Sequence, residues 1–295
     1  MIFVSSSCVQ NQYIVDSVRE LINAGFRNIE LSGGTERYPD LEKDLISLKA
    51  NYQLRFQLHN YFPPPPSHFM LNLASLNDGI FRKSIELCKQ AITLSAKVGG
   101  TRYGVHAGFL MDFSPREAGK KITAQKLNSQ TLGLKRFGIA WAELELFAKD
   151  HNVKLYVENN VLSKKNFETF DKKNPFLLTD YNSFLDLRGE CEFNILCDVA
   201  HLYVSCNTLG LDFAEESSRL LGRSDYIHVS DNNGFEDQNN TLESGSKIVE
   251  ILEIQALTGK TITLEIYGDV ELLQSSRDKL NTLLMAPTDL SRSSP

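Results

Sequence analysis

The chain has 295 residues, a common length for a single α/β barrel, and its 42% hydrophobic and 23% charged residues are typical of a folded globular protein. A net charge of −6, with scattered lysines and arginines, argues against an extended nucleic-acid-binding surface. No stretch approaches the roughly 18 apolar residues of a membrane span, and the five cysteines show no CxxC spacing. We therefore expect a cytoplasmic protein with reduced thiols and no membrane partner.

Short apolar strands alternate with amphipathic helices along the whole chain. Strands are predicted at residues 2–5, 28–31, 54–59, 102–109, 154–160, 193–199, 226–229 and 261–266. Helices are predicted at residues 11–24, 41–52, 80–98, 132–150, 180–187, 213–221, 247–257 and 269–284. Eight strand-helix units are what a closed (β/α)₈ barrel requires. We expect one such TIM barrel over residues 1–288, followed by a flexible tail at 289–295.

Acidic residues and histidines stand at or just after the ends of the predicted strands. They are Glu30, His59, His106, Glu158, Asp198, His201, His228, Asp231 and Glu265. Because the active site of such a barrel lies at the carboxyl ends of its strands, we expect these side chains to converge on one mouth. A single histidine is more often structural. Burying this many polar groups around one axis without a ligand, however, would cost about 1 to 3 kcal/mol for each unsatisfied group.

Four of these residues suggest a metal site. Glu158, Asp198, His228 and Glu265 offer three carboxylates and one imidazole. This oxygen-rich set suits one divalent cation, with Mn²⁺, Mg²⁺ or Co²⁺ favoured and Zn²⁺ as an alternative. In the competing interpretation, Glu158 and Glu265 only form salt bridges inside the barrel, but buried ion pairs stabilise a fold little.

A basic segment follows the fourth predicted strand. Residues 112–126 include Arg116, Lys120 and Lys121. The simplest interpretation is a solvated helix face. If the segment instead folds over the mouth, Arg116 and Lys120 would supply charge-assisted hydrogen bonds to a phosphate or carboxylate on the substrate.

A series of short motifs carries a family resemblance. In chain order they are His59, Asn72-Leu-Ala-Ser75, Val105-His-Ala-Gly108, Val157-Glu-Asn159, Cys197-Asp-Val-Ala-His201, His228-Val-Ser-Asp-Asn232, Asp237, Gly245 and Leu264-Glu-Ile266. With these motifs the chain resembles the xylose-isomerase-like TIM barrels. That group contains sugar and sugar-phosphate isomerases, ketose 3-epimerases, inosose-type dehydratases and apurinic-site endonucleases.

The two branches of this group imply different metal sites. The isomerase and epimerase branch implies metal ligands at Glu158, Asp198, His228 and Glu265, with His201 contacting the substrate. In the endonuclease branch, the positions of His59, His106, His201 and Asp237 also help to hold three zinc ions. The Asp-x-His motif of that branch reads Asp237-Gln-Asn239 here. The missing imidazole argues against a trinuclear site.

The resemblance therefore implies a metal-dependent isomerase or epimerase of a sugar, sugar phosphate or related polyhydroxy carbonyl compound. Glu158 and Glu265 would transfer the proton through an enediolate. The substrate contacts would come from His201, His59, His106, Glu30, Asp231, Arg116 and Lys120. One alternative is an apurinic-site endonuclease-like phosphodiesterase, and another is a metal-binding barrel without catalysis in a larger assembly. The expected partner is a small carbohydrate, not nucleic acid, and the assembly considered is a homodimer.

Overall fold

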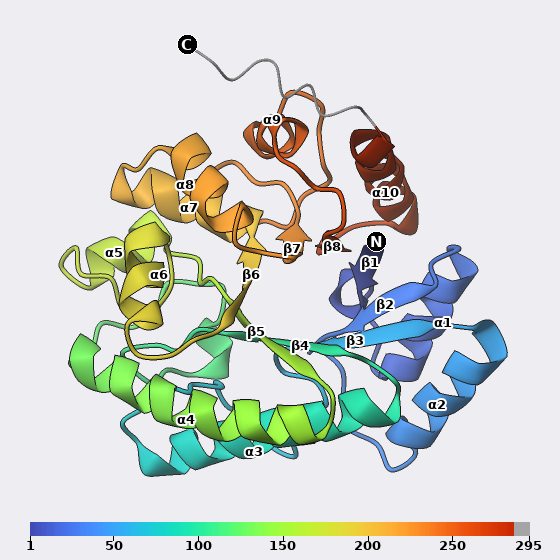
Figure 1. The fold of residues 1–295 in the computed structure, drawn as a ribbon, viewed down its shortest axis with the longest axis horizontal. Helices are drawn as coiled ribbons and strands as arrows, with labels where there is room; N and C mark the ends of the chain where they lie inside the picture. Colours follow the sequence, from blue (N-terminus) through green and yellow to red (C-terminus); the bar gives the residue numbers. More distant parts are fainter. Residues whose placement is uncertain (286–295) are drawn as a thin grey trace.

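The computed structural model describes residues 1–285, in which eight parallel strands close into one barrel (Figure 1). Each strand pairs with the next one in the chain, and the last pairs with the first. The strands are β1 (Ile2–Ser5), β2 (Asn28–Leu31), β3 (Arg55–His59), β4 (Arg102–His106), β5 (Lys154–Glu158), β6 (Asn194–Asp198), β7 (Tyr226–Val229) and β8 (Thr261–Leu264). The predicted (β/α)₈ barrel is confirmed, whereas the predicted tail at 289–295 lies outside the described residues.

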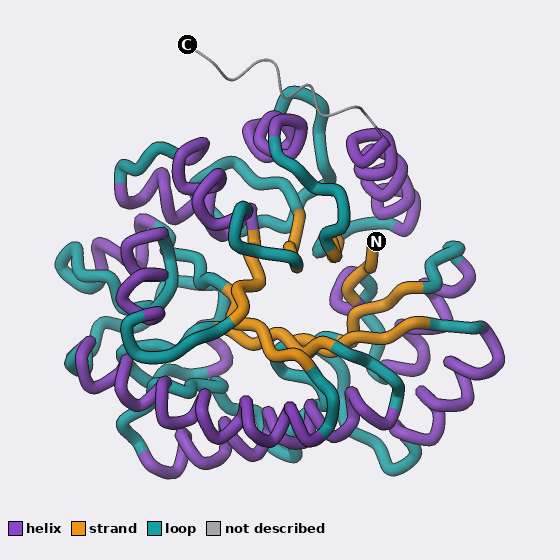
Figure 2. Tube along the Cα trace, viewed as in Figure 1, coloured by secondary structure: helices purple, strands orange, loops and turns teal. Residues whose placement is uncertain are grey.

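Helices surround the ring of strands, as Figure 2 shows. They are α1 (Ile14–Asn23), α2 (Leu41–Tyr52), α3 (Asp78–Lys97), α4 (Gln130–Asp150), α5 (Lys164–Thr169), α6 (Tyr181–Arg188), α7 (Val199–Leu209), α8 (Phe213–Leu221), α9 (Lys247–Ile254) and α10 (Val270–Met285). Two 3₁₀ turns, η1 (Ser6–Cys8) and η2 (Pro115–Glu117), complete the elements. The sequence did not predict α5 or α7. Within residues 1–285, none of the helices has both the length and the apolar character that crossing a membrane requires.

Side chains alternate along the strands between the helices and the barrel interior, as the pleat of a strand demands. In β7, Ile227 and Val229 join the main apolar core, whereas Tyr226 packs with Tyr156 and Leu196 in a separate cluster. Each member of this cluster precedes a predicted site residue by two positions: Glu158, Asp198 or His228. The three apolar side chains therefore form a floor directly beneath the polar strand ends.

One glycine makes room inside the barrel. A Cβ atom placed on Gly104 of β4 would lie 2.8 Å from Cδ2 of Leu196 and 3.1 Å from Cδ2 of His59. The first distance is shorter than ordinary carbon contacts allow. Glycine at this position lets the floor and the histidine of β3 approach the axis of the barrel.

Candidate active site

The spacing of Asp198 and His201 is fixed by a helix cap. Asp198 ends β6 and is the N-cap of α7, where its Oδ1 accepts a hydrogen bond from the backbone N–H of His201 at 2.7 Å. Asn159, at the end of β5, bonds both backbone groups of Asp198. Oδ2 of Asp198 lies 3.8 Å from Nε2 of His201. The same turn therefore places a carboxylate and an imidazole side by side.

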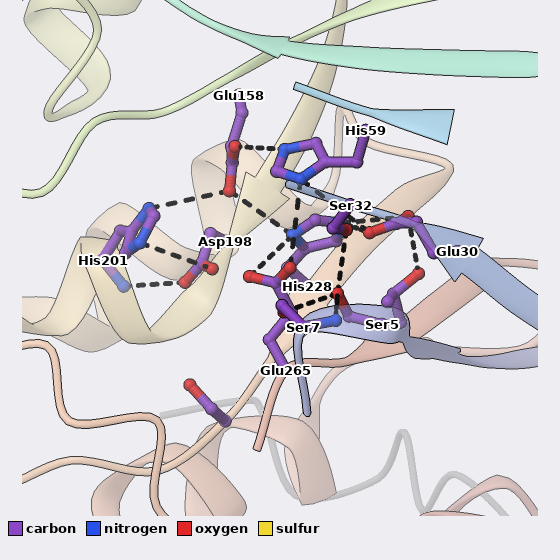
Figure 3. Close-up of polar contacts among 12 residues, drawn as sticks. Ser5, Ser7, Glu30, Ser32, His59, Glu158, Asp198, His201, His228 and Glu265 are labelled. Carbon is purple, nitrogen blue, oxygen red and sulfur yellow. Dashed lines mark hydrogen bonds and ion pairs between the residues drawn. The ribbon is translucent and has the colours of Figure 1, made fainter. Parts of the chain in front are cut away.

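His228 is fully buried among three carboxylates, which come from β2, β5 and the residue after β8 (Figure 3). Its Nε2 lies 3.0 Å from Oε1 of Glu30. Its Nδ1 lies 3.4 Å from Oε1 of Glu158 and 3.4 Å from Oε2 of Glu265. One edge of the imidazole ring thus faces Glu30, and the other edge faces the strand ends.

Glu30 orients this imidazole ring. Its Oε2 accepts hydrogen bonds from Nε2 of Gln57 and Oγ1 of Thr263, each at 3.0 Å. With Nε2–H of His228 donating to the same carboxylate, Nδ1 faces the strand ends and can bind a metal that displaces its proton. Glu30 is completely buried and does not line the cavity above the site. The sequence-based expectation that Glu30 contacts the substrate is therefore corrected, because this carboxylate lies behind His228.

The four predicted metal ligands converge. Glu158, Asp198, His228 and Glu265 each offer one ligand atom, and these atoms all lie within 4.8 Å of one another. Oε1 of Glu158 and Nδ1 of His228 are buried and have no hydrogen-bond partner. Buried polar atoms are rarely left unpaired because each one costs stability. These residues therefore fit a divalent cation, and we call them the candidate cation site.

Changing Glu30 to glutamine should weaken cation binding about 10- to 100-fold, because an outer carboxylate fixes the orientation and raises the basicity of a ligating histidine. Titration calorimetry with Mn²⁺ would measure the change. Glu42→Gln, on the outer surface of α2, is the matched control and should bind like the wild type. Equal affinities for the Glu30 variant and the wild type would show that His228 does not depend on Glu30.

Three further histidines surround Glu158. Nε2 of His59 and Nδ1 of His106 lie 2.7 and 3.1 Å from its Oε2, and Nδ1 of His201 lies 3.7 Å from its Oε1. His106, Glu158 and His201 form a second group with ligand atoms within 4.8 Å of one another. Nε2 of His201 lies 3.3 Å from Oδ2 of Asp237. The structure thus brings the predicted histidines together around one carboxylate.

Burial and neighbouring charges shift the pKa values of the site residues in different directions. Burial raises the pKa of Asp198 to about 7, although the nearby His201 opposes this shift. Burial alone would raise the pKa of Glu265, but the charge of His228, the hydrogen bond from His228 and the charge of His59 together outweigh burial and lower the pKa to about 2. Burial lowers the pKa of the His106 imidazole to about 4. At neutral pH the site therefore presents an ionised Glu265 beside a neutral His106.

A cavity of about 960 Å³ lies above the candidate cation site, at the upper end of the range for small-molecule sites. From the predicted set, its lining includes His59, His106, Glu158, His201 and Glu265. Neutral residues from the loops after β1 and β2 form another part of the wall: Ser6, Ser7, Ser32, Gly33, Gly34 and Thr35. Serine and threonine hydroxyls and backbone groups suit hydrogen bonding to an uncharged, hydroxyl-rich molecule.

Asp231 does not line this cavity. Its Oδ1 accepts a hydrogen bond from the backbone N–H of Asn232 at 2.9 Å, and its Oδ2 accepts one from that of Glu243 at 3.2 Å. The carboxylate therefore holds the loop that follows β7. The expectation that Asp231 contacts the substrate is corrected by this position. Asp231 lies two residues beyond the end of β7 at Val229, where these hydrogen bonds, rather than the alternation of the strand, set the direction of its side chain.

The structure places the two predicted substrate-binding cations of the basic segment in different surroundings. Lys120 lines a smaller cavity of about 240 Å³, which shares His106, His201 and Asp237 with the larger one. Arg116 is exposed on η2 and lines neither cavity, although its neighbours Pro115 and Ala118 line the larger one. The segment thus reaches the mouth of the barrel, but only one of the two predicted cations faces a cavity.

Sequence reasoning missed the supporting residues. Gln57 and Thr263 each precede a site residue by two positions, so both share its inward face. Each is a polar residue inside an otherwise apolar strand, and this pattern could have predicted a supporting role in the site. Asn159 belongs to one of the family motifs, directly after Glu158, but the motif alone indicated no structural role for it.

Most of the sequence matches a family model. The model describes a xylose isomerase-like TIM barrel and matches residues 18–283. The chain belongs to the xylose isomerase-like TIM barrel family. The family resemblance inferred from the motifs is therefore confirmed.

The chain is similar to other proteins at low sequence identity. An uncharacterized protein from Methanocaldococcus jannaschii is 22% identical over 255 residues, covering 85% of this chain and 77% of that protein. A D-tagatose 3-epimerase-like protein superposes with a TM-score of 0.72 at 19% identity, covering 96% of each chain. Endonuclease IV from Thermus thermophilus superposes with a TM-score of 0.59 at 15% identity, covering 96% of this chain and 98% of that one.

Proposed function

We propose that this protein is a metal-dependent isomerase or epimerase that acts on a sugar, a sugar phosphate or a related polyhydroxy carbonyl compound. The observation that carries the proposal is the pair of carboxylates Glu158 and Glu265. Glu158 ends β5 and Glu265 directly follows β8. Each has an oxygen 3.4 Å from Nδ1 of His228, and both line a cavity with a largely neutral polar wall on one side. This arrangement suits a substrate with many hydroxyl groups and one acidic C–H bond.

The residues of the chain divide the chemistry among them. A divalent cation held by Glu158, Asp198, His228 and Glu265 would polarise the substrate carbonyl and stabilise negative charge beside it. Glu265, with its low pKa, is ionised and can accept a carbon-bound proton. Burial would raise the pKa of Glu158, but the charges of neighbouring histidines outweigh burial and hold the pKa low, so Glu158 is also ionised. It can return a proton to carbon only after taking one from His59, whose Nε2 lies 2.7 Å from its Oε2. Nε2 of His201 lies near Asp237 at the cavity wall, where the ring can bond a substrate hydroxyl.

The structural comparisons support this proposal. The D-tagatose 3-epimerase-like protein and an L-ribulose 3-epimerase superpose with TM-scores of 0.72 and 0.70, against 0.59 for endonuclease IV. The L-ribulose 3-epimerase match covers 100% of this chain and 99% of that one, at 16% identity. Similarity at this level concerns the fold, so the site geometry remains the main support.

Solvent exchange tests the proposal even while the sugar is unidentified. The protein would be incubated with Mn²⁺ in D₂O with separate ketoses, aldoses and their phosphates. Mass spectrometry and NMR would then report deuterium at carbon. We expect deuterium at one carbon of at least one sugar, together with a new isomer or epimer. Complete absence of both exchange and product across the panel would overturn the proposal.

A nuclease is the second candidate, favoured by the His106–Glu158–His201 group beside Asp237. Asn239 lies at the cavity wall, where it accepts a hydrogen bond from Ser230, in place of the histidine expected in that branch. We expect no incision of DNA containing an abasic site and no cluster of three zinc ions. Gel assays and anomalous diffraction on zinc-loaded protein would check both, with the Asn239→His variant as a comparison. Efficient incision by the wild type would favour the nuclease.

Lys120 provides a test for an anionic substrate. If the substrate carries a phosphate, Lys120→Ala should raise KM about 10-fold through loss of one charge-assisted hydrogen bond. KM for the uncharged counterpart should scarcely change. Arg116→Ala is the control, because Arg116 lies in the same segment but lines neither cavity. Equal effects of Lys120→Ala on KM for both substrates would show that the segment is only a solvated surface and does not bind the substrate.

A further inference from the structure

The smaller cavity, of about 240 Å³, continues the cavity above the candidate cation site. His106, His201 and Asp237 line both cavities. The two histidines also flank Glu158, with ring nitrogens 3.1 and 3.7 Å from its carboxylate oxygens. Separate small-molecule sites usually have volumes of about 300 Å³ or more. We therefore treat the smaller cavity as an extension of the larger one, joined to it beside Glu158.

Aromatic side chains form one wall of the smaller cavity. Phe109 packs edge to face against Phe113 and Phe176, with ring centroids 5.1 and 5.7 Å apart. Met70 and Ile122 line the same cavity. Four of these side chains belong to a buried apolar cluster that is separate from the main core, and the half-buried Phe113 packs against it. A wall of this kind favours a flat apolar group, which can pack against the faces and edges of the rings.

Hydrogen bonds hold this wall in position. The backbones of Phe109 and Phe176 form an antiparallel bridge. Oδ1 of Asn166 on α5 accepts a hydrogen bond from the backbone N–H of Ile122 at 2.9 Å, and its Nδ2 donates to the backbone oxygen of Lys120 at 3.1 Å. The wall is therefore in place before a ligand arrives, so that binding requires little ordering of the protein.

Most charged groups around the smaller cavity already have partners. Nζ of Lys165 lies 2.6 Å from Oε1 of Glu236. The carboxylate of Glu117 accepts hydrogen bonds from two backbone N–H groups of its own loop, at 3.0 and 2.8 Å. Lys120 is exposed, so its ammonium group can remain in water. A ligand group in this cavity thus meets apolar surface without displacing a charge from its partner.

We propose that the substrate carries an apolar substituent of about the size of a phenyl ring, which occupies the smaller cavity while the polyhydroxy part occupies the larger one. A cavity of about 150 Å³ can hold benzene, so about 240 Å³ leaves room for a substituted ring. The shared residues His106 and His201 bring the link between the two parts close to Glu158. The proposal rests on the proposed function, because that function fills the larger cavity with a polyhydroxy carbonyl compound.

Binding of 4-bromobenzyl alcohol tests the apolar cavity without any sugar. This probe is uncharged, carries a phenyl ring, and has a bromine that anomalous diffraction can locate. We expect binding in about the millimolar range by titration calorimetry, with the bromine in the smaller cavity beside Phe109. Val161→Phe places a ring in the smaller cavity alone and should weaken binding at least about 10-fold. Val270→Phe, at a half-buried valine of α10 outside both cavities, is the matched control and should bind like the wild type.

A second variant removes part of the wall instead of filling the space. Phe113→Ser takes away one ring and should weaken binding of the probe by a similar factor. No binding to the wild type, bromine found only outside the smaller cavity, or equal affinities in the wild type and both variants would overturn the proposal. Displacement of the probe by inorganic phosphate would also overturn it, because the cavity would then take an anionic group at Lys120.

The sugar panel in D₂O separates this proposal from the proposed function. For a sugar that undergoes exchange, the phenyl derivative should have a KM about 10- to 100-fold below that of the methyl derivative, since only the phenyl group fills the smaller cavity. Val161→Phe should remove this difference, and Val270→Phe should keep it. Equal KM values in the wild type would show that the substrate carries no such substituent. If the probe binds in the smaller cavity but no sugar exchanges, the isomerase is wrong and the binding site for an apolar group stands.

Discussion

Replacing Asp198 by alanine is expected to abolish binding of a divalent cation at about one per chain while leaving the barrel folded. The change removes one of four converging ligands. It also removes the N-cap of α7, which costs about 0.5 to 2 kcal/mol, a loss that a barrel of this size should tolerate. Elemental analysis of the purified protein would measure the cation, and circular dichroism would follow folding.

Two further variants separate these roles of Asp198. Asp198→Asn keeps a side-chain oxygen for the cap but removes the negative charge, so cation content should fall while the melting temperature changes little. Asp212→Ala removes the N-cap of α8, where the side chain accepts from Glu215, and should retain the full cation content. Equal cation content in the wild type and Asp198→Ala would rule out Asp198 as a ligand.

Changing Glu158 or Glu265 to glutamine should lower turnover about 10²- to 10⁴-fold, the usual contribution of a positioned acid or base. Glutamine keeps the size of the side chain and an oxygen ligand but cannot exchange a proton. Rates of deuterium incorporation and of product formation would both be followed. Glu216→Gln is a matched control, since Glu216 is a buried glutamate of α8 that bonds Tyr181, outside both cavities.

The labelling pattern decides the mechanism. With proton transfer through Glu158 and Glu265, deuterium from the solvent appears at one substrate carbon during wild-type turnover. Turnover without any incorporated deuterium would instead indicate a hydride shift between adjacent carbons. The two glutamates would then keep only their place in the candidate cation site.

The sequence predicted the strands well because each is a short apolar run that ends abruptly in polar residues. In the structure, His59, His106, Glu158 and Asp198 occupy the last position of their strands. The predicted end matches for the strand of His59, whereas the other three predicted strands run one to three residues too far. Helix α7 was missed because β6 passes into it without a loop, so the apolar residues after Asp198 looked like a continuing strand. The side chain of Asp198 ends the strand and caps the helix at once, a double role that composition does not reveal.

The roles of Glu30 and Asp231 required three-dimensional information. Both lie at or near strand ends, so their positions in the sequence predict the same role, a contact with the substrate. In the structure, Glu30 lies within reach of His228, whereas Asp231 lies beyond the end of β7 and bonds backbone N–H groups of its own loop. A position at a strand end therefore predicts only that a residue lies near the mouth of the barrel. Its hydrogen-bond partners determine whether the side chain reaches the cavity.

Glu30, Gln57 and Thr263 form a hydrogen-bonded trio inside the barrel. At these positions, changes that raise thermal stability are expected to lower cation affinity. These side chains fill interior positions that well-packed apolar residues would stabilise better. Joint replacement of Glu30, Gln57 and Thr263 by leucine, methionine and valine would release His228 from its fixed orientation and leave its buried Nε2 without the partner at 3.0 Å. The melting temperature should therefore rise only when His228 is replaced by an apolar residue as well. A heat-resistant variant of this kind would be a stable scaffold with a weakened metal site.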